Sequence, residues 1–490
     1  MIRATLAAGL ALAFIPTARA AEQIVTLGDS LTFAYEAEFG FRVKILNPST
    51  FSLETHGDGF DTYRPGKVRN WIETLNHATY RHDWFDIGTR RTFTIPLVSG
   101  TFLLRHEYNW AIPGARAADL HDFISGNKSF TDIANSSDSG DSGLSVGEAM
   151  VLAGIDDSDF SLTELRTQVQ SQAERLTYFV GGNDMRGVYG GIYNATLTPA
   201  EIEAFVSGFV SDSTAVIDQV QTWNPGIPIV IVAVPHIGIT PEIRGKYPTD
   251  PVKTGYVTDV TRDLNQRLKS LADSRGLGFA DIFGPTLGLL DGTAPFTIHG
   301  IPFTNAGSVT GDLDYVWLNG EFSANFHPNT NAQAVIANVI IHAFNTTYGD
   351  EIPLLTASEM LGGLLGKSAA QIDMSFANWM TGFQLTGLGE SDDSDGDGIP
   401  AVVEFALGLD PTYPDSDFVS LESTGSGYEL RYPIRLPSTT EVTVDAETGL
   451  TLDDFTPVTP SPTVAADGYA HAPLPGDNQA FIRLNANTSP

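Results

Sequence analysis

The chain has 490 residues, of which 59 are acidic and 27 are basic, so its formal net charge at pH 7 is −32. So much negative charge repels nucleic acid and anionic membranes, and we therefore expect neither as a partner. The chain has no cysteine, which excludes disulfides, thiolate-bound metal and thiol redox chemistry.

Residues 1–20 have the features of a secretory signal peptide in the expected order. Arg3 precedes an apolar run from Leu6 to Ile15, and Ala18-Arg19-Ala20 supplies the small residues of a cleavage site. The run is too short to cross a bilayer, and no later segment is apolar over enough residues to do so. The sequence thus predicts a secreted protein, extracellular or periplasmic, cleaved after Ala20. A buried N-terminal helix is the alternative.

From residue 21 to residue 350, short apolar runs alternate with amphipathic stretches. Strands are predicted at 24–27, 176–180, 227–234 and 277–283, and helices at 202–223, 257–272 and 331–344. Because the strands are apolar on both faces, we expect an α/β domain with a parallel sheet covered by helices. A segment rich in Ser, Asp and Gly at 125–147 predicts a mobile surface loop.

Ser30 follows the first apolar run, in the sequence IVTLGDSLT. A residue at this turn lies at the carboxyl edge of a parallel sheet, where open α/β sheets bind ligands. Backbone N–H groups and the dipole of the following helix favour a developing oxyanion at such a place. Taken alone, Ser30 is better explained as a helix N-cap, because Gly-Asp-Ser also suits a turn.

Four segments resemble, in order, the signature blocks of the GDSL (SGNH) hydrolases. They are LGDSLT, NWAIPGARAADL, FVGGNDMRG and FHPNTNAQAVIAN. The resemblance implies a three-layer α/β/α sandwich of flavodoxin-like type. It also implies that Ser30 is the nucleophile and His327 the general base, that Gly114 and Asn183 donate hydrogen bonds to the oxyanion, and that catalysis needs no cofactor.

The chain departs from the family at one position. The family usually has an aspartate three residues before the histidine, and this chain has Ala324 there. Either a backbone carbonyl orients the imidazole or another acid does, since orienting acids need not be adjacent in sequence. Glu321 is the nearest candidate, and Asp314 and Asp312 lie further away.

A second serine, Ser145, fits the pattern G-x-S-x-G of the α/β-hydrolase nucleophile elbow. That elbow follows an apolar strand, whereas the polar sequence NSSDSGDS precedes Ser145. We therefore expect Ser30, and not Ser145, to be the nucleophile.

The sequence DSDGDGIPAVVE fits the calcium-loop pattern D-x-[DN]-x-[DN]-G-x₅-E. It resembles the loops of thrombospondin type-3 and dockerin-like repeats. The expected Ca²⁺ ligands are the carboxylates of Asp393, Asp395, Asp397 and Glu404 and the carbonyl of Ile399. Such an ion would be structural, and the alternative is a solvated acidic linker.

The pattern divides the chain into a signal peptide (1–20), a hydrolase domain (21–350), a helical connector (351–390), the calcium loop (391–411) and a small C-terminal β-domain (412–490). The sequence predicts a secreted serine hydrolase that cleaves acetyl or short acyl esters through an acyl-enzyme. Its substrate is expected to be a small molecule or a polysaccharide. The alternatives are a lipase or phospholipase and a non-catalytic carbohydrate-binding surface protein.

Overall fold

The computed structural model describes residues 3–6, 21–40, 42–47, 50–60, 67–76, 84–94, 101–136, 145–248, 250–291, 295–322, 324–415, 418–424, 427–435, 442–449, 454–458, 461–464, 468–474 and 481–488. The chain forms two compact units. The N-terminal unit comprises Ala21–Phe296 and Thr304–Asp350. The C-terminal unit comprises Met1–Ala20, Thr297–Phe303 and Glu351–Pro490.

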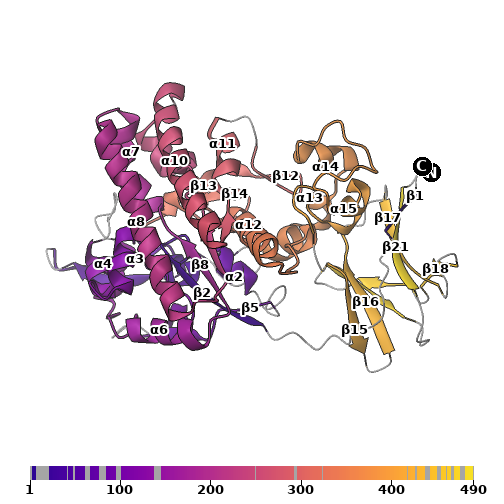
Figure 1. The fold of residues 1–490 in the computed structure, drawn as a ribbon, viewed down its shortest axis with the longest axis horizontal. Coiled ribbons are helices and arrows are strands. Elements are labelled where there is room, and N and C mark those ends of the chain that lie inside the picture. The colour runs from indigo at the N-terminus through magenta and orange to yellow at the C-terminus, as the bar shows by residue number, and fades with distance from the viewer. Residues whose placement is uncertain are drawn as a thin grey trace. The chain divides into compact units, whose positions relative to one another are not determined.

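A parallel sheet forms the centre of the N-terminal unit (Figure 1). In the described residues it has five strands in the order β10-β9-β8-β2-β5. They are β2 (Glu22–Gly28), β5 (Phe85–Asp86), β8 (Arg175–Phe179), β9 (Ile229–Val232) and β10 (Gly278–Ala280). Numbered along the chain, this is the 2-1-3-4-5 order of flavodoxin-like folds. The predicted α/β class is confirmed, and the predicted strands are β2, β8, β9 and β10.

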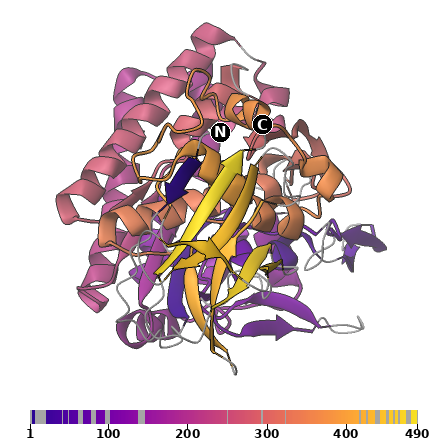
Figure 2. The same cartoon turned by 90° about the vertical axis from the view of Figure 1, so that its right-hand side faces the viewer.

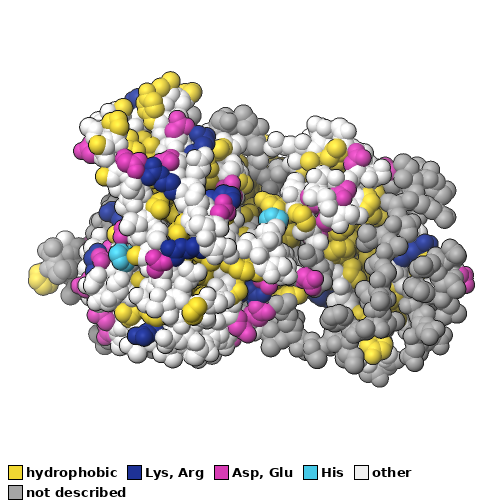
Figure 3. Space-filling view, in the orientation of Figure 1, with side chains coloured by type: hydrophobic (Ala, Val, Ile, Leu, Met, Phe, Trp, Pro, Cys, Tyr) yellow, Lys and Arg dark blue, Asp and Glu magenta, His cyan; other side chains and the backbone are white. Residues whose placement is uncertain are grey.

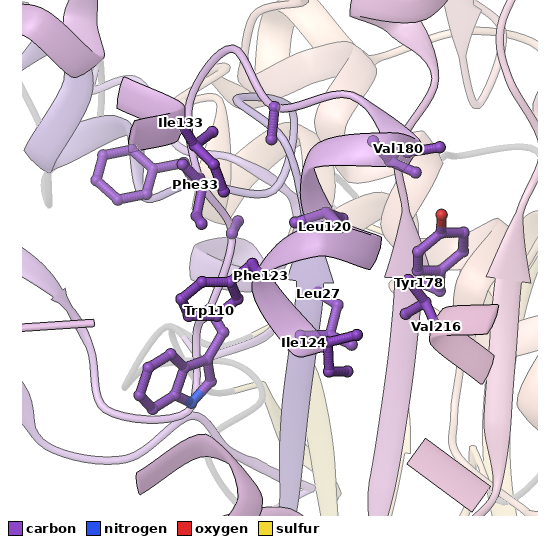
Figure 4. Close-up of a cluster of buried hydrophobic side chains, with 14 of the residues drawn as sticks. Leu27, Phe33, Trp110, Leu120, Phe123, Ile124, Ile133, Tyr178, Val180 and Val216 are labelled. Atoms are coloured by element: carbon purple, nitrogen blue, oxygen red, sulfur yellow. The ribbon is translucent and has the colours of Figure 1, made fainter. Parts of the chain in front are cut away.

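Helices form a layer on each side of this sheet. On one side, α2 (Trp71–Leu75) packs against α12 (Thr330–Tyr348), which also contacts β9 and β10. On the other, α8 (Pro199–Trp223) contacts α3 (Ala117–Ile124), α6 (Leu162–Ser171) and α10 (Pro251–Arg275). Figure 4 shows side chains of α3 and α8 packed near Leu27 of β2 and Tyr178 of β8.

Shorter elements surround this core. The helices are α1 (Tyr35–Phe39), α4 (Phe130–Ser136), α5 (Val146–Leu152), α7 (Gly182–Tyr193), η1 (Ile237–Ile239), α9 (Pro241–Lys246), α11 (Phe283–Asp291) and η2 (Ala324–Phe326). The strand pairs are β3 (Val43–Asn47) with β4 (Ser52–His56), β6 (Arg90–Phe93) with β7 (Phe102–His106), and β13 (Thr304–Ser308) with β14 (Tyr315–Leu318).

The loop predicted at 125–147 is in part helical. Helix α4 lies within it, and Phe130 stacks on Phe160 with ring centroids 4.2 Å apart. Ile133 is also buried, so two apolar residues a helical turn apart anchor this polar segment to the core. Residues 137–144 lie outside the described part of the chain.

The C-terminal unit contains two small antiparallel sheets, as predicted for the end of the chain (Figure 2). In the described residues the first has the order β1-β21-β17-β18 and the second β15-β16-β20-β19. The strands are β1 (Arg3–Leu6), β15 (Ser420–Thr424), β16 (Gly427–Pro433), β17 (Val442–Gly449), β18 (Thr456–Pro457), β19 (Thr463–Val464), β20 (Tyr469–Pro473) and β21 (Phe481–Thr488). A hairpin of β11 (Thr297–Ile298) and β12 (Ile301–Pro302) also belongs to this unit.

Four helices complete the C-terminal unit in its described part. They are the π-helix η3 (Ser358–Leu364), α13 (Ala369–Ile372), α14 (Phe376–Gly382) and α15 (Ala401–Leu407). Fully buried Trp379 of α14 and Phe405 of α15 meet edge to face with ring centroids 5.4 Å apart. Helix α15 also packs on β17 and β21, so it links the helices to the first sheet.

The predicted signal peptide is described only at residues 3–6. These form β1, the indigo strand beside the yellow strands in Figure 2, which pairs antiparallel with β21. Cleavage after Ala20 would remove β1 and leave β21 at the edge of its sheet. None of the described helices has the length and apolar character needed to span a bilayer.

Basic side chains on the N-terminal unit lie beside acidic ones (Figure 3). Arg267 of α10 pairs with Glu203 of α8 at 2.8 Å, and Arg275 pairs with Asp218 between the same helices. Pairs of this kind neutralise the positive charge locally, so the two helices present mixed charge.

Candidate active site

Ser30 lies in the turn between β2 and α1, at the carboxyl end of β2. The strand order changes direction between β2 and β8, and ligands bind at such switch points in open α/β sheets. The Asp29 N–H donates to the Phe179 carbonyl at 3.2 Å, and the Asp29 carboxylate accepts from the Leu31 N–H at 2.9 Å. The first bond ties the turn to the end of β8, and the second stabilises the turn itself.

Two asparagine side chains hold the segment that follows Ser30. The Asn70 amide donates to the carbonyls of Thr32 and Phe33 at 2.7 and 2.8 Å. The Asn109 amide donates to the Thr32 carbonyl at 2.8 Å. Both asparagines are fully buried, so these bonds lie away from competing water. Sequence reasoning missed both residues, because each acts on a loop distant from it in the chain.

The structure brings the expected nucleophile and base together. Ser30 Oγ lies 2.7 Å from His327 Nε2, although 297 residues separate them in the chain. Ser30 is 5% exposed and His327 3% exposed. The His327 N–H donates to the Ala324 carbonyl at 2.9 Å, and its own carbonyl accepts from the Leu318 N–H at 3.1 Å. These bonds fix the main chain that carries the imidazole.

The second segment reaches the same edge of the sheet. The Ile112 N–H donates to the Gly28 carbonyl at 2.9 Å, which joins the turn of Gly114 to the end of β2. Gly114 has φ +80°, a conformation that favours glycine. In the described part of the chain, neither the Ser30 N–H nor the Gly114 N–H donates to a protein acceptor. Both are therefore able to donate to a substrate oxygen.

The third segment contributes Asn183 in the first turn of α7. Its side-chain amide donates to the Ala115 carbonyl at 3.1 Å, which places Asn183 beside the Gly114 turn. Asp184, the next residue, accepts from the Ala117 N–H at the start of α3, at 3.2 Å. The Arg186 guanidinium lies over the ring of Phe326, which directly precedes His327. All four segments thus meet at one end of the sheet.

A cleft of about 310 Å³ opens beside Gly114 and Asn183. Its lining in the described residues is small or polar: Gly114, Arg116, Ala118, Asp119, Lys128, Ser136, Asn183, Arg186 and Gly187. Two of its cations are paired, Lys128 with Asp119 at 2.8 Å and Arg186 with Glu242 at 2.7 Å. No branched aliphatic or aromatic side chain is among the described residues that line it.

The Glu321 side chain binds residues other than His327. Its two carboxylate oxygens accept from His56 Nδ1 and from the Gly57 N–H, each at 2.7 Å. Asp312 and Asp314 are exposed. The expectation that Glu321 is the acid of the site therefore finds no support in its contacts, because both oxygens are directed to the β3–β4 region.

Sequence reasoning also missed a carboxyl beside the imidazole. Glu38 of α1 is buried, and its Oε1 lies 3.7 Å from His327 Nε2. The sequence held one signal for it. In a helix, Glu38 lies on the same face as Tyr35 and Phe39, and an apolar residue is usual on such a face. Burial raises the pKa of Glu38 well above its usual range, and the charges of Asp29, Asp58 and Glu73 add to this.

The predicted calcium loop is folded into the C-terminal unit. Asp393 accepts from the N–H groups of Gly396 and Gly398 at 2.7 and 2.9 Å, and Asp397 accepts from the Ile399 N–H at 2.7 Å. Carboxylate oxygens of Asp393, Asp395 and Asp397 lie within 4.8 Å of one another. The loop thus gathers its first three expected ligands.

A second group of carboxylates contains Asp397, Glu404 and Asp415, also within 4.8 Å of one another. Glu404 is fully buried, and neither of its oxygens has a hydrogen-bond partner in the described structure. Burial raises the pKa of Glu404 to about 10, and the nearby charges of Asp395 and Asp415 add to this. Such a group suits a hard divalent cation, because buried carboxylates without partners are costly. Asp415 lay beyond the sequence motif and was not predicted.

A comparison with protein families supports the resemblance that the four segments indicated. The family described as GDSL-like lipase/acylhydrolase matches residues 24–340. No curated protein matches the sequence significantly.

Three solved structures align with the chain at low identity. An extracellular lipase from Streptomyces rimosus is 15% identical, and the alignment covers 66% of this chain and 100% of that one, with a TM-score of 0.32. A family 3 carbohydrate esterase from Talaromyces cellulolyticus is 11% identical over 65% and 94%, with a TM-score of 0.29. A phospholipase A1 from Streptomyces albidoflavus is 14% identical over 67% and 99%, with a TM-score of 0.30. Alignments this weak carry no argument of their own, but the sequence match spans more than half of the chain. The protein therefore belongs to the family of GDSL-like lipases and acylhydrolases.

Proposed function

We propose that the protein is a secreted serine hydrolase that cleaves acetyl or short acyl esters through an acyl-enzyme on Ser30. The observation that carries this proposal is the 2.7 Å separation of Ser30 Oγ and His327 Nε2. A serine hydroxyl is a weak nucleophile until a base takes its proton, and imidazole titrates near neutral pH. The two free backbone N–H groups of Ser30 and Gly114 lie at the same edge of the sheet.

In the first half of the reaction, His327 Nε2 takes the proton of Ser30 as Oγ attacks the ester carbonyl. The N–H groups of Ser30 and Gly114 and the Asn183 amide hold the resulting oxyanion. The intermediate collapses, the alcohol leaves with the proton from His327, and the acyl group stays on Ser30. In the second half, His327 activates a water that releases the acid and restores Ser30.

The cleft beside Gly114 and Asn183, whose described lining does not include Ser30 or His327, supports a short acyl group or a polar substrate. Long acyl chains need an apolar surface, and the described lining of this cleft consists of small and polar residues. Acetylated carbohydrates and small soluble esters therefore fit better than lipids. The substrate is proposed as a class, and the alternative is a lipase or phospholipase.

The test is hydrolysis of p-nitrophenyl acetate by wild type, Ser30→Ala and Ser145→Ala. Ser145 is a matched control because its hydroxyl accepts from the Glu148 N–H and caps α5. We expect Ser30→Ala to lose essentially all turnover and Ser145→Ala to keep it. Equal, negligible turnover in wild type and Ser30→Ala would instead favour the non-catalytic carbohydrate-binding protein.

A panel of esters then defines the substrate. We expect kcat/KM to fall as the acyl chain lengthens from acetyl to octanoyl, because the described cleft offers no apolar wall. A rise with chain length would favour the lipase. Release of acetate from acetylated polysaccharides, measured beside the chromogenic esters, distinguishes carbohydrate esters from other short esters.

We also propose that the acidic group of the C-terminal unit binds a structural Ca²⁺. Asp393, Asp395, Asp397, Glu404 and Asp415 would hold the ion, with the carbonyl of Ile399 as a further ligand. The proposal is supported by the unpartnered, buried oxygens of Glu404. A solvated linker does not suit that burial. Bound there, the cation would neutralise the carboxylates and stabilise α15 against β17 and β21.

A further inference from the structure

Helix α1 surrounds the imidazole of His327 with three side chains. The rings of Phe39 and Tyr35 meet it edge on, with centroids 5.0 and 6.2 Å away. Glu38, from the same face, has Oε1 3.7 Å from His327 Nε2. This is the nitrogen that contacts Ser30, so the carboxyl lies beside the position to which the serine proton moves.

Glu38 is 1% exposed, and its Oε2 has no hydrogen-bond partner in the described structure. The titratable groups that face it are Asp29 from the nucleophile turn, Asp58 after β4, Glu73 of α2, Tyr35 of its own helix and His327. Of these, only the imidazole of His327 becomes positive on protonation. Burial and the neighbouring acids strongly disfavour an ionised Glu38. The imidazolium of His327 is the group among them that can offset this cost.

Resting on the proposed function, we propose that Glu38 is a positioning residue whose carboxylate stabilises the imidazolium of His327 during acyl transfer. The proton of Ser30 Oγ moves to His327 Nε2, and Glu38 neither gains nor loses a proton in that step. The carboxylate opposes the new positive charge at short range in a water-poor site, where such interactions are strong. Glu38 thus supplies from α1 the negative charge that Ala324 cannot supply.

This role has a signature in the pH profile. Because burial and the neighbouring acids raise the pKa of Glu38, its carboxylate forms only as the pH rises. Wild type should therefore gain rate as Glu38 ionises, and the pair of Glu38 and His327 should titrate together. A neutral amide at position 38 cannot follow this change. The kcat of wild type relative to Glu38→Gln should therefore grow with pH.

The experiment measures kcat and kcat/KM for p-nitrophenyl acetate from about pH 5 to about pH 9. Wild type, Glu38→Gln, Glu38→Asp and Glu36→Gln are compared, each with its thermal unfolding. Glu36 is the matched control, since it lies on the same helix and pairs with Arg90 at 2.6 Å.

We expect Glu38→Gln to lower kcat by about 10- to 100-fold at alkaline pH and much less at acidic pH. The Glu38→Gln profile should lack the additional rise in kcat that wild type shows as Glu38 ionises. Glu38→Asp should keep the shape of the wild-type profile at a lower plateau, and Glu36→Gln should match wild type.

A ratio of wild-type to Glu38→Gln kcat that does not change with pH would overturn the proposal, because a purely structural defect gives such a ratio. If Glu38→Gln does not fold, the wild-type profile decides. Two separate rises of kcat with pH support the pair, because attraction between the carboxylate and the imidazolium spreads their two proton losses apart, and a single rise contradicts it. Ser30-dependent turnover in wild type tests the proposed function separately, so failure of one idea is distinguishable from failure of the other.

Discussion

The side-chain amide of Asn183 donates to the Ala115 carbonyl at 3.1 Å, so α7 is bonded to the turn that contains Gly114. The two segments that carry the proposed oxyanion donors Gly114 and Asn183 are thereby held in one arrangement before substrate arrives. A donor fixed in advance costs no reorganisation during the reaction, and this is the main source of its effect on rate.

Asn183→Ala is therefore expected to lower kcat by about 10²- to 10³-fold, or about 2.7–4 kcal/mol of barrier, with little change in KM. Steady-state kinetics on p-nitrophenyl acetate measure this. Asn194→Ala is a control at the other end of α7, where Asn194 is the C-cap residue. An unchanged kcat in Asn183→Ala would remove Asn183 from the oxyanion site.

Glu321→Gln should leave kcat unchanged, because both oxygens of Glu321 bind His56 and Gly57. The amide keeps one acceptor for these donors and loses the charge. We expect only a modest loss of stability, about 1 kcal/mol, read from thermal or urea unfolding. A large fall in kcat with intact folding would return Glu321 to the site as the acid that acts on His327.

Ca²⁺ bound as proposed should raise the melting temperature of the C-terminal unit, because Glu404 is buried and neither of its oxygens has a hydrogen-bond partner among the described residues. Differential scanning calorimetry of chelated protein, with Ca²⁺ added back, measures the shift. Asp415→Asn should weaken Ca²⁺ binding by about 10-fold or more, since ligand charge sets affinity at such sites.

Asp392→Asn is the matched control for this experiment. Asp392 lies in the same loop, but its carboxylate accepts from the Gly389 N–H and is outside both carboxylate groups. It should bind Ca²⁺ as wild type does. Metal-free protein that melts at the same temperature with and without added Ca²⁺ would refute a structural ion.

Asp184 makes stability depend on pH. Burial raises its pKa from 3.8 to about 7 in the folded protein. The folded state therefore holds a proton that the unfolded state has released between these values, and folding stability falls as pH rises through this range. Asp184→Asn removes the charge and keeps an acceptor for the Ala117 N–H.

The variant should match wild type near about pH 4 and be more stable by up to about 4 kcal/mol near about pH 8. Urea unfolding at both pH values measures the difference. A gain that is equal at the two pH values would show that the effect has a cause other than ionisation of Asp184.

The sequence alone determined the main strands and helices of the sheet domain and the order of the four family segments. Apolar runs at 24–27 and 176–180 become β2 and β8 because strands buried on both faces must be continuously apolar. The turn with Ser30 follows from the same local pattern. The family match over residues 24–340 confirms the resemblance that the four segments indicated. The short strand β5 escaped prediction, since two residues leave no periodicity to detect.

Tertiary structure alone decided which distant side chains meet. Asn70 and Asn109 fix the nucleophile turn, Glu38 faces His327, and Asp415 joins the carboxylates around Glu404. The sequence does not show which of these residues pair, because hydrogen bonds and charge interactions depend on distance in space and on burial, not on separation along the chain. The sequence showed that Ala324 replaces the aspartate usual in the family. Only the tertiary structure showed that Glu38 lies beside the imidazole, because this depends on how α1 packs against His327.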